Sequence, residues 1–341
     1  MNRLVVTVSL AVVLAGSAVG GALAQNTSSL LLTAHGDPDI QGLFTFSTLT
    51  PLHRPVIDAG ASALLSGRVA LTSEEAAVYE ASRRSELNRD EQNLEIHAPG
   101  VRYQSLAEGG VGGYNEFWYE RGVELTRDKR TSLVVDPPTG RIPFRADYQA
   151  KASVRQLNIR NGFADSYTDR SLSDRCLMGF NAGPPMVSSA FINNVQILQT
   201  PDVVVIFNEM VRNARIIPLD GRHHGILRQY SGDSRGRWEG ETLVVETKNF
   251  LRETSLGGSS EQTHLVERFR REDADTVVYE FTVEDPSNFS RPWTAVMPLR
   301  RTDGPLFEYA CHEGNIGLEG ILAGARNPVS YTHLRAHEPL R

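Results

Sequence analysis

From Asn194 onward the sequence is a succession of short extended segments divided by turns, and no other feature restricts the possible folds as strongly. The predicted strands span residues 195–200, 203–210, 214–219, 226–230, 242–250, 264–271, 276–284, 293–300 and 306–311. They recur at spacings of about ten residues without a helical pattern between them, which is typical of an antiparallel meander. So many strands suggest a closed or nearly closed β-barrel.

The predicted strand at 242–250 indicates how such a barrel would be used. Leu243 and Val245 share a face with Thr247 and Asn249, so the likelier inner face begins apolar and ends polar. A barrel packed at one end, with a polar mouth that holds a ligand, would use this gradient. Turns rich in Gly, Asp and Ser are predicted before the strand, at 220–222 and 231–236.

The region before the meander has a different pattern. Thr72 and Glu75 have the spacing of a capping box, which predicts a helix that runs to about Leu87. We therefore expect residues 25–190 to form a mixed α/β region packed on a barrel of residues 191–327. The predicted fold class is mainly β, with a barrel-like, calycin-like C-terminal half and a partly helical N-terminal half.

Both ends of the chain call for separate treatment. Residues 1–24 are predicted to be a signal peptide, because the apolar run Leu4–Val19 is followed by the cleavage pattern Ala22-Leu23-Ala24. A membrane anchor is the alternative. We expect a periplasmic or secreted protein with no membrane contact after signal cleavage. Residues 328–341 resemble translated sequencing-adapter read-through, so we expect a non-native tail.

Charge and cysteine content narrow the possible partners. The formal net charge is −6, and the chain has no Lys/Arg run, which argues against nucleic acid as a partner. Two cysteines, Cys176 and Cys311, suggest one disulfide in an exported chain, and two buried free thiols are the alternative.

Several motifs resemble known proteins. Gly236-Arg-Trp238 within a meander resembles the calycin and lipocalin architecture, which implies a fold and no function. Longer motifs resemble a widespread family of exported bacterial proteins, and they are Asp220-Gly-Arg-His-His224, Gly232-Asp-Ser-Arg-Gly-Arg-Trp-Glu-Gly-Glu-Thr-Leu-Val-Val245 and Glu308-Tyr-Ala-Cys-His-Glu-Gly-Asn315. This resemblance covers most of residues 38–327 and implies no reaction. The family pattern often reads Asp-Gly-Arg-Pro-His, so it matches His224 and leaves His223 without a counterpart.

Four polar residues are candidates for catalysis without a cofactor. Glu308 and His312 are four residues apart, so a strand at 306–311 would point both into the barrel. A histidine beside a carboxylate can act as a general acid or base near neutral pH. Glu267 and Tyr279 each share a predicted face with apolar residues, where a polar group needs a partner or a ligand. The predicted catalytic residues are His312, Glu308, Tyr279 and Glu267, and structural hydrogen bonding is the alternative for each.

Ligand contacts are predicted around the barrel mouth. Glu209 ends an apolar strand face, Trp238 belongs to the Gly-x-Trp motif, and Arg222 in the turn would anchor the ligand. The predicted ligand-binding residues are Arg222, His224, Asp220, Glu209, Asn249 and Trp238.

Two other kinds of site have weaker support. Zinc would require His224, His264 and His312 with Glu308 or Glu313, but no His-x-His spacing supports such a set, so we predict no metal. Gly232-Asp-Ser234-Arg-Gly236 matches the Gly-x-Ser-x-Gly of a nucleophile elbow, which needs a helix after the serine. A further strand follows instead, so a hairpin turn is the better interpretation.

Three functional hypotheses follow. The leading one is an acid–base enzyme (a lyase, an isomerase or a hydrolase) that acts in the barrel cavity on a small, neutral or anionic organic molecule. The second is a lipocalin-type binding protein with no turnover, and the third is an extracytoplasmic structural or interaction module. The sequence leaves the oligomeric state open.

Overall fold

The computed structural model describes residues 31–56, 60–90, 115–148, 164, 166–252, 256 and 259–326. The chain divides into two units, Met1–Leu30 and Leu31–Arg341, and the description below concerns the second. The predicted signal peptide and the predicted non-native tail lie outside the described residues. Within the described residues, no helix has the length and apolar character needed to cross a bilayer.

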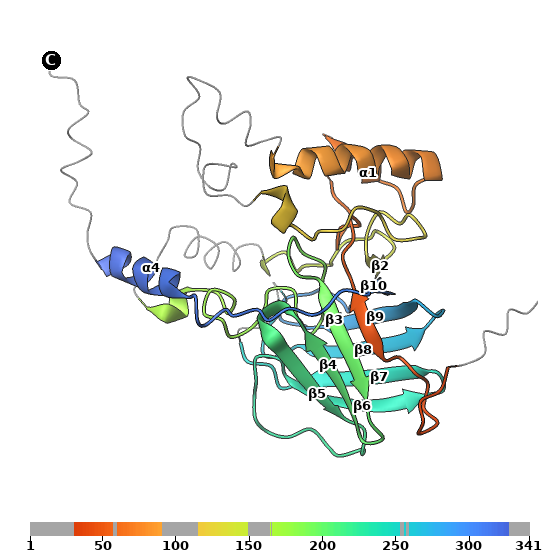
Figure 1. The fold of residues 1–341 in the computed structure, drawn as a ribbon, viewed down its shortest axis with the longest axis vertical. Helices are drawn as coiled ribbons and strands as arrows, with labels where there is room; N and C mark the ends of the chain where they lie inside the picture. The colour runs from red at the N-terminus through yellow and green to blue at the C-terminus, as the bar shows by residue number, and fades with distance from the viewer. Residues whose placement is uncertain are drawn as a thin grey trace, which may run out of the picture. The chain divides into compact units, whose positions relative to one another are not determined.

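The described elements are mostly strands (Figure 1). The helices are α1 (Ser73–Leu87) and α4 (Ile316–Arg326), and the 3-10 turns are η1 (Ala61–Leu65), η3 (Glu116–Trp118), η4 (Tyr167–Asp169) and η5 (Met210–Arg212). The strands are β1 (Gly42–Thr45), β2 (Val134–Asp136), β3 (Asn194–Gln199), β4 (Val203–Asn208), β5 (Asn213–Pro218), β6 (Asp233–Glu239), β7 (Thr242–Lys248), β8 (His264–Arg271), β9 (Thr276–Glu284) and β10 (Trp293–Arg301).

The strands form one antiparallel sheet. Its order is β5-β4-β3-β1-β10-β9-β8-β7-β6, and β2 pairs with β10 beside this path. The two end strands approach each other closely, because a Cβ added at Gly236 of β6 would lie 2.8 Å from the Cγ2 atom of Ile217 in β5. The sheet is therefore a nearly closed barrel, and the predicted mainly β class with an antiparallel meander is confirmed.

The first strand of the barrel comes from the N-terminal half. β1 lies between β3 and β10, with Phe44 opposite both Val195 and Arg301. β2 also pairs with β10, with Val134 opposite Ala295. The sheet therefore begins well before residue 191, which was the expected start of the barrel.

Three local predictions are wrong. Residues 226–230 contribute an isolated bridge, from Gln229 to Phe250, in place of a strand, and residues 306–311 pair with no strand of the sheet. The turn predicted at 231–236 is mostly strand β6, in which Asp233 pairs with Lys248 and Glu239 with Thr242. A turn at Tyr230 and Ser231 precedes β6, and the turn between β6 and β7 lies at Gly240, whose φ of 58° suits glycine.

The barrel interior is filled by side chains. Alternate residues of β8, β9 and β10 point inward with almost no exposed surface, and these include Leu265, Phe269, Val277, Phe281, Trp293, Met297 and Leu299. The rings of Phe281 and Trp293 meet edge to face with centroids 5.7 Å apart. The inward positions of these strands therefore form a hydrophobic core, packed as densely as protein interiors usually are.

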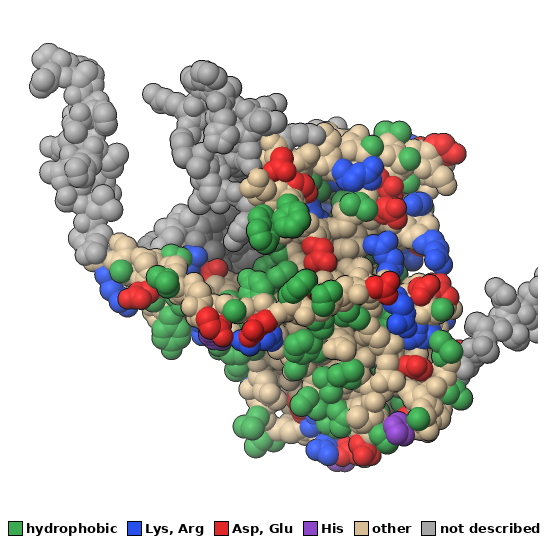
Figure 2. Space-filling view, viewed as in Figure 1, with side chains coloured by type: hydrophobic (Ala, Val, Ile, Leu, Met, Phe, Trp, Pro, Cys, Tyr) green, Lys and Arg blue, Asp and Glu red, His purple; other side chains and the backbone are tan. Residues whose placement is uncertain are grey.

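The outward faces of the barrel differ in charge. The outward side chains of β3, β4 and β5 are uncharged, and apolar side chains gather over this part of the surface in Figure 2. The outward positions of β6, β7 and β8 carry Asp, Glu, Lys, Arg and His. The ionisable side chains on the outside of these strands are therefore concentrated on β6, β7 and β8.

A second hydrophobic cluster lies beside the barrel. Tyr79 of α1 packs with Leu49, Leu65 and Leu125, and its hydroxyl donates to Leu49 O at 3.3 Å. The predicted capping box of α1 is present, since Thr72 Oγ1 accepts from the N–H of residue 75 and the carboxylate of that residue accepts from Thr72 N. The helix thus buries one narrow face, as its mostly polar sequence predicts.

Candidate functional site

Two of the predicted catalytic residues do meet inside the barrel. The Tyr279 hydroxyl donates to Glu267 Oε1 at 2.7 Å, and both side chains lack exposed surface. Arg215 of β5, which the sequence did not single out, donates to Glu267 Oε2 at 2.5 Å and to Oε1 at 2.9 Å. The Tyr279 hydroxyl also accepts from Met186 N at 3.1 Å. The network is complete within the protein, so it serves the fold directly.

The electrostatics of this network agree with a structural role. Burial raises the pKa of Tyr279 well above its usual value, and the neighbouring Glu267 carboxylate raises it further. Burial lowers the pKa of Arg215, but attraction to Glu267 outweighs this effect and leaves it raised. Tyr279 therefore stays protonated and Arg215 stays charged at physiological pH.

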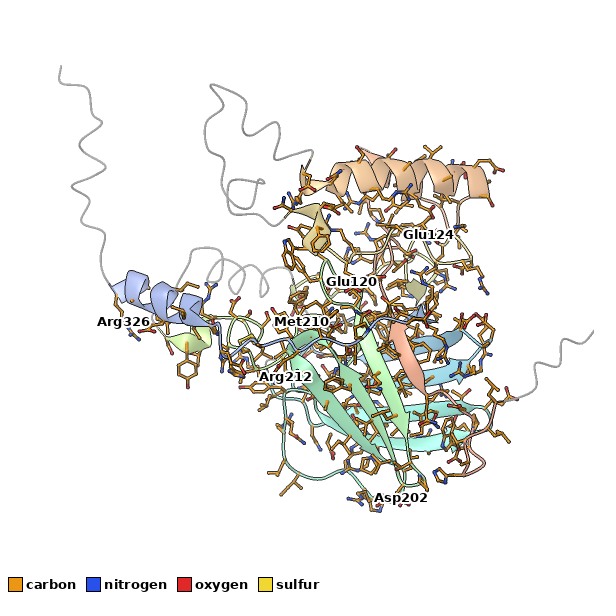
Figure 3. All side chains as sticks on the ribbon, viewed as in Figure 1. Glu120, Glu124, Asp202, Met210, Arg212 and Arg326 are labelled. Atoms are coloured by element: carbon orange, nitrogen blue, oxygen red, sulfur yellow. A yellow bond between two sulfur atoms is a disulfide. The ribbon has the colours of Figure 1, made fainter. Side chains whose placement is uncertain are left out.

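The other two predicted catalytic residues lie outside the barrel. Glu308 and His312 are both exposed, and Glu308 pairs at 2.6 Å with Arg212, which is labelled in Figure 3. The expected inward orientation is wrong because residues 306–311 pair with no strand. Neither side chain lies in the barrel interior, so catalytic roles for Glu308 and His312 remain predictions.

Glu209 anchors the segment that carries Glu308. It is buried, its Oε2 accepts from Asn194 Nδ2 at 2.9 Å, and its Oε1 accepts from Phe307 N at 2.8 Å. These contacts tie the C-terminal segment to the ends of β3 and β4. Glu209 was predicted to contact a ligand, but in the structure both of its carboxylate oxygens accept hydrogen bonds from the protein.

The disulfide predicted from the cysteine count is present. Cys176 and Cys311 are bonded, with Cα atoms 5.6 Å apart. Asn315 Nδ2 donates to Asp174 O at 2.8 Å beside it. The disulfide and these contacts hold the segment before α4 against the loop that precedes β3.

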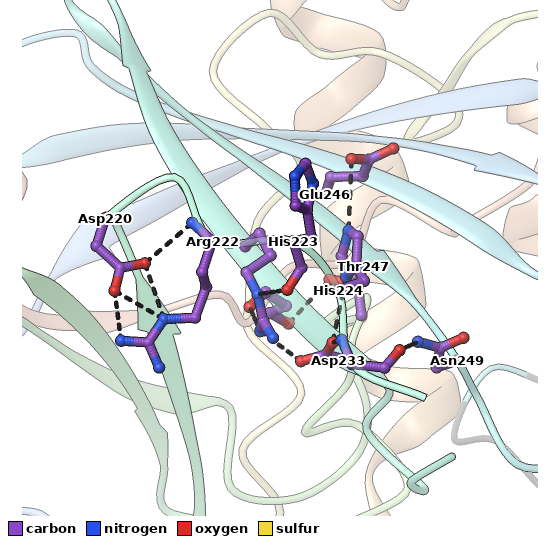
Figure 4. A network of polar contacts seen from close by, with 11 residues as sticks. Asp220, Arg222, His223, His224, Asp233, Glu246, Thr247 and Asn249 are labelled. Carbon is purple, nitrogen blue, oxygen red and sulfur yellow. Dashed lines mark hydrogen bonds and ion pairs between the residues drawn. The ribbon is translucent and has the colours of Figure 1, made fainter. Parts of the chain in front are cut away.

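A group of histidines and carboxylates lies on the outward side of β6, β7 and β8 (Figure 4). Glu246 is its centre: His264 Nε2 lies 2.7 Å from Oε1, and His224 Nε2 lies 3.4 Å from Oε2. Asp233 Oδ2 is 3.4 Å from the other ring nitrogen of His224. We call His224, Asp233, Glu246 and His264 the histidine cluster.

The cluster keeps Glu246 ionised. A 2.7 Å ion pair with Lys248 and hydrogen bonds from the histidines lower its pKa from 4.5 to about 2, against a smaller opposing effect of burial. Each imidazole thus faces a carboxylate that is charged at any physiological pH. Such an arrangement can hold and pass protons.

Of the remaining predicted ligand-binding residues, Asn249, Asp220 and Arg222 lie in or beside the loop around the cluster, and Trp238 does not. Asn249 Nδ2 donates to Gly225 O at 2.7 Å, and Asp220 pairs with Arg222 at the exposed rim. Trp238 faces inward and packs against the barrel core. Of the predicted set, the structure thus brings His224 into the histidine cluster and Asn249 close to it, and it places Trp238 apart from them.

Neither alternative kind of site is formed. In the described part of the chain, no group of three or more His, Cys, Asp or Glu side chains is arranged to hold a metal ion. Ser234 is buried in β6, and its hydroxyl bonds Thr247 Oγ1 at 2.9 Å in place of a histidine. The strand also continues through Gly236, so there is no nucleophile elbow.

A cavity of about 310 Å³ lies between the second hydrophobic cluster and the barrel. Its walls come from distant parts of the sequence: residues 48–52, Pro55, η1, α1, Arg121, Leu133 and residues 188–190. Leucines form much of the wall, and threonine and serine hydroxyls add polar groups. No sequence pattern predicts this cavity, since its residues meet only in the folded chain. We call it the helix–sheet cavity.

Comparisons with known proteins add little to this geometry. No protein-family model matches the chain, and no curated protein matches it. A solved structure, described as the crystal structure of a mutant of the fluorescent protein UnaG, is similar to part of it, at 14% identity over 33% of this chain and 72% of that chain. The TM-score is 0.23, too low to carry an argument about fold or ligand. The resemblance to exported bacterial proteins therefore stays a prediction.

Proposed function

We propose that this chain is an exported protein that binds a small organic molecule in the helix–sheet cavity. The observation that carries the proposal is the cavity itself, whose volume of about 310 Å³ falls at the lower end of the range for ligand pockets. Leu65 and Leu133 give it a buried apolar wall, and hydroxyl groups supply a few polar contacts. Binding pockets commonly combine these two features.

The barrel interior is a poorer candidate. Its inward side chains are packed against one another, and the Arg215–Glu267–Tyr279 network satisfies its own hydrogen bonds. A ligand there would have to displace core side chains, which is costly in a densely packed interior. The cavity beside α1 requires no such displacement.

Export is supported by two features. The predicted signal peptide directs the chain out of the cytoplasm, and the Cys176–Cys311 disulfide suits an oxidising compartment. We therefore propose a periplasmic or secreted binding protein.

A thermal-shift screen with a metabolite panel tests the proposal. A ligand that binds only the folded protein raises the unfolding temperature in a concentration-dependent way. Ser62→Trp should abolish the shift, because Ser62 lines the cavity and an indole would fill it. The matched control is Ala63→Trp, at an exposed neighbour that does not line the cavity. A ligand that shifts both variants equally would place its site elsewhere.

Acid–base chemistry is a second candidate function, now assigned to the histidine cluster. One observation favours it: Glu246 contacts two partly exposed imidazoles, at 2.7 Å and 3.4 Å. An elimination, isomerisation or hydrolysis would use one imidazole as base or acid. A turnover screen with His264→Gln and His224→Gln, and with the exposed His223→Gln as control, tests it. Turnover that survives in both His264→Gln and His224→Gln would remove the cluster from consideration.

A further inference from the structure

The helix–sheet cavity has a one-sided charge. Arg83 and Arg121 line it, and none of its lining residues is Asp or Glu. Two other cavities differ in charge. The one beside the disulfide is lined by Asp174 and Glu308 without Lys or Arg, and the third mixes both signs. The helix–sheet cavity is therefore suited to a negatively charged ligand. Its apolar wall has a low dielectric constant, which strengthens the attraction between the arginines and such a ligand.

Arg121 is held in a fixed orientation. Its Nη1 donates to Leu87 O at 2.7 Å and to Glu116 Oε2 at 3.2 Å. Its guanidinium lies 3.6 Å from the centroid of the Tyr119 ring, and that ring stacks on Phe191 at 4.8 Å. The side chain is thus preorganised, which reduces the entropy lost when a ligand binds.

The same contacts leave one edge of the guanidinium available. Every hydrogen bond that Arg121 donates to the described residues leaves from Nη1, so within that part of the chain Nε–H and Nη2–H have no acceptor. This pair of parallel donors matches the two oxygens of a carboxylate. Only 12% of the side chain is exposed, and burial lowers the pKa of Arg121 against the raising effect of Glu116. Glu116 already pairs with Nη1 at 3.2 Å, so an anionic ligand would be a second partner, on the opposite edge of the guanidinium.

The rest of the cavity suits an apolar group. Pro51, Leu52, Pro55 and Leu87 line it and keep part of their surface exposed, beside the buried Leu65, Leu133 and Tyr79. Arg83 also lines the cavity, and the partly exposed Glu86 pairs with its Nη1 at 2.9 Å. One wall thus offers charge and the other offers apolar contact.

We propose that the helix–sheet cavity selects an amphiphilic carboxylate, with both oxygens on the Nε–Nη2 edge of Arg121 and the apolar part against the leucine wall. This inference rests on the proposed binding function and names its ligand class. The binding step is non-covalent, and it requires no cofactor.

Three probes with the same alkyl chain and different head groups test the charge preference. Octanoate, 1-octanol and octylamine are titrated into the full-length protein at neutral pH by calorimetry. Octanoate should bind at least about tenfold more tightly than 1-octanol, and octylamine should bind most weakly, because hydrogen bonds to charged groups exceed neutral ones. Equal affinity for octanoate and 1-octanol would overturn the charge preference while leaving the binding function intact.

Two variants locate the site. Arg121→Gln should lower octanoate affinity to that of 1-octanol, and Arg121→Lys should give an intermediate value, because it keeps the charge and loses the bidentate edge. Arg127→Gln is the control, as that side chain is 84% exposed and lines a different cavity. Circular dichroism shows whether each variant folds. Unchanged octanoate binding in a folded Arg121→Gln would overturn the assignment.

The outcomes separate the two proposals. If 1-octanol and octanoate bind equally and Ser62→Trp abolishes both, the cavity binds ligands without charge selection. If none of the three probes binds, the carboxylate proposal fails, and the metabolite panel with Ser62→Trp decides the binding function independently.

Discussion

Arg215 and Glu267 form a bidentate ion pair inside the barrel, with Nη1–Oε2 and Nη2–Oε1 distances of 2.5 and 2.9 Å. Arg215 lies on β5 and Glu267 on β8, which are not neighbours in the sheet. The pair therefore connects the two end regions of the nearly closed barrel across its interior. Tyr279 and the backbone complete the hydrogen bonding of this network.

Removing the charge of Glu267 should destabilise the fold strongly. Glu267→Gln leaves the buried Arg215 without a counter-charge, so the free energy of unfolding should fall by about 3–5 kcal/mol. Urea denaturation followed by circular dichroism measures this loss. The control is Glu308→Gln, which breaks an exposed pair with Arg212 and should cost less than about 1 kcal/mol. Similar small losses in both variants would contradict the structural role of the network.

Removing the disulfide should also lower stability. Cys176 and Cys311 are 135 positions apart, and a cross-link over a long loop restricts the unfolded chain, so the double variant Cys176→Ser/Cys311→Ser should lose about 2–5 kcal/mol. Denaturant unfolding without reductant measures the change. Adding reductant should lower the midpoint of the wild-type protein and leave the double variant unaffected. If reductant also lowered the midpoint of the double variant, its effect could not be assigned to the Cys176–Cys311 disulfide.

Glu246 should give the protein a distinct response to acid. Its pKa is lowered in the folded state from 4.5 to about 2, so the ionised group stabilises the fold fully above pH 4.5, and this contribution is lost as the pH falls toward 2. Glu246→Gln lacks it. Thermal unfolding from pH 7 to pH 2 should show a gap between wild type and variant that is constant above about pH 4.5 and closes below it.

A gap that stays constant down to about pH 2 would contradict the lowered pKa. Lys248→Met is a useful companion variant, because the hydrogen bond from Lys248 is the largest cause of the shift. In that background, the gap between the protein that keeps Glu246 and the one that also carries Glu246→Gln should be smaller and should close at a higher pH.

The capping box of α1 should contribute measurably. Thr72→Ala removes the hydroxyl that accepts from the Glu75 N–H at 3.2 Å, so the free energy of unfolding should fall by about 1 kcal/mol. Thr72→Ser keeps an acceptor in the same place and should retain nearly full stability. Denaturant midpoints of the two variants, measured side by side, test this. Equal losses would point to the methyl group and away from the cap.

Local sequence patterns determined much of the fold. β8 and β9 have the predicted bounds, and buried and partly exposed positions alternate along most of each strand. The helix at Thr72 was predictable because a capping box involves only neighbouring residues. Pro218 lies on the end strand β5, where its missing N–H breaks no ladder. Each of these features depends on interactions within one or two segments.

Other local patterns were misleading because tertiary pairing outweighed them. Gly232, Asp233 and Ser234 are turn residues, yet Asp233 and Ser234 begin β6 since β7 offers a continuous partner. The alternation at 306–311 suits a strand, but this segment pairs with no strand of the sheet. Glu308 and His312 consequently lie at the surface.

Only the tertiary structure decided which polar residues meet. The sequence by itself determined a mainly β chain, the two cysteines of the disulfide, and the inward faces that carry Glu267 and Tyr279. It did not determine that Arg215 neutralises Glu267, that His264 joins His224 at Glu246, or that Arg121 borders a cavity with Leu133. These residues are far apart in the chain, and periodicity reports which face a side chain occupies but not which distant segment lies opposite it.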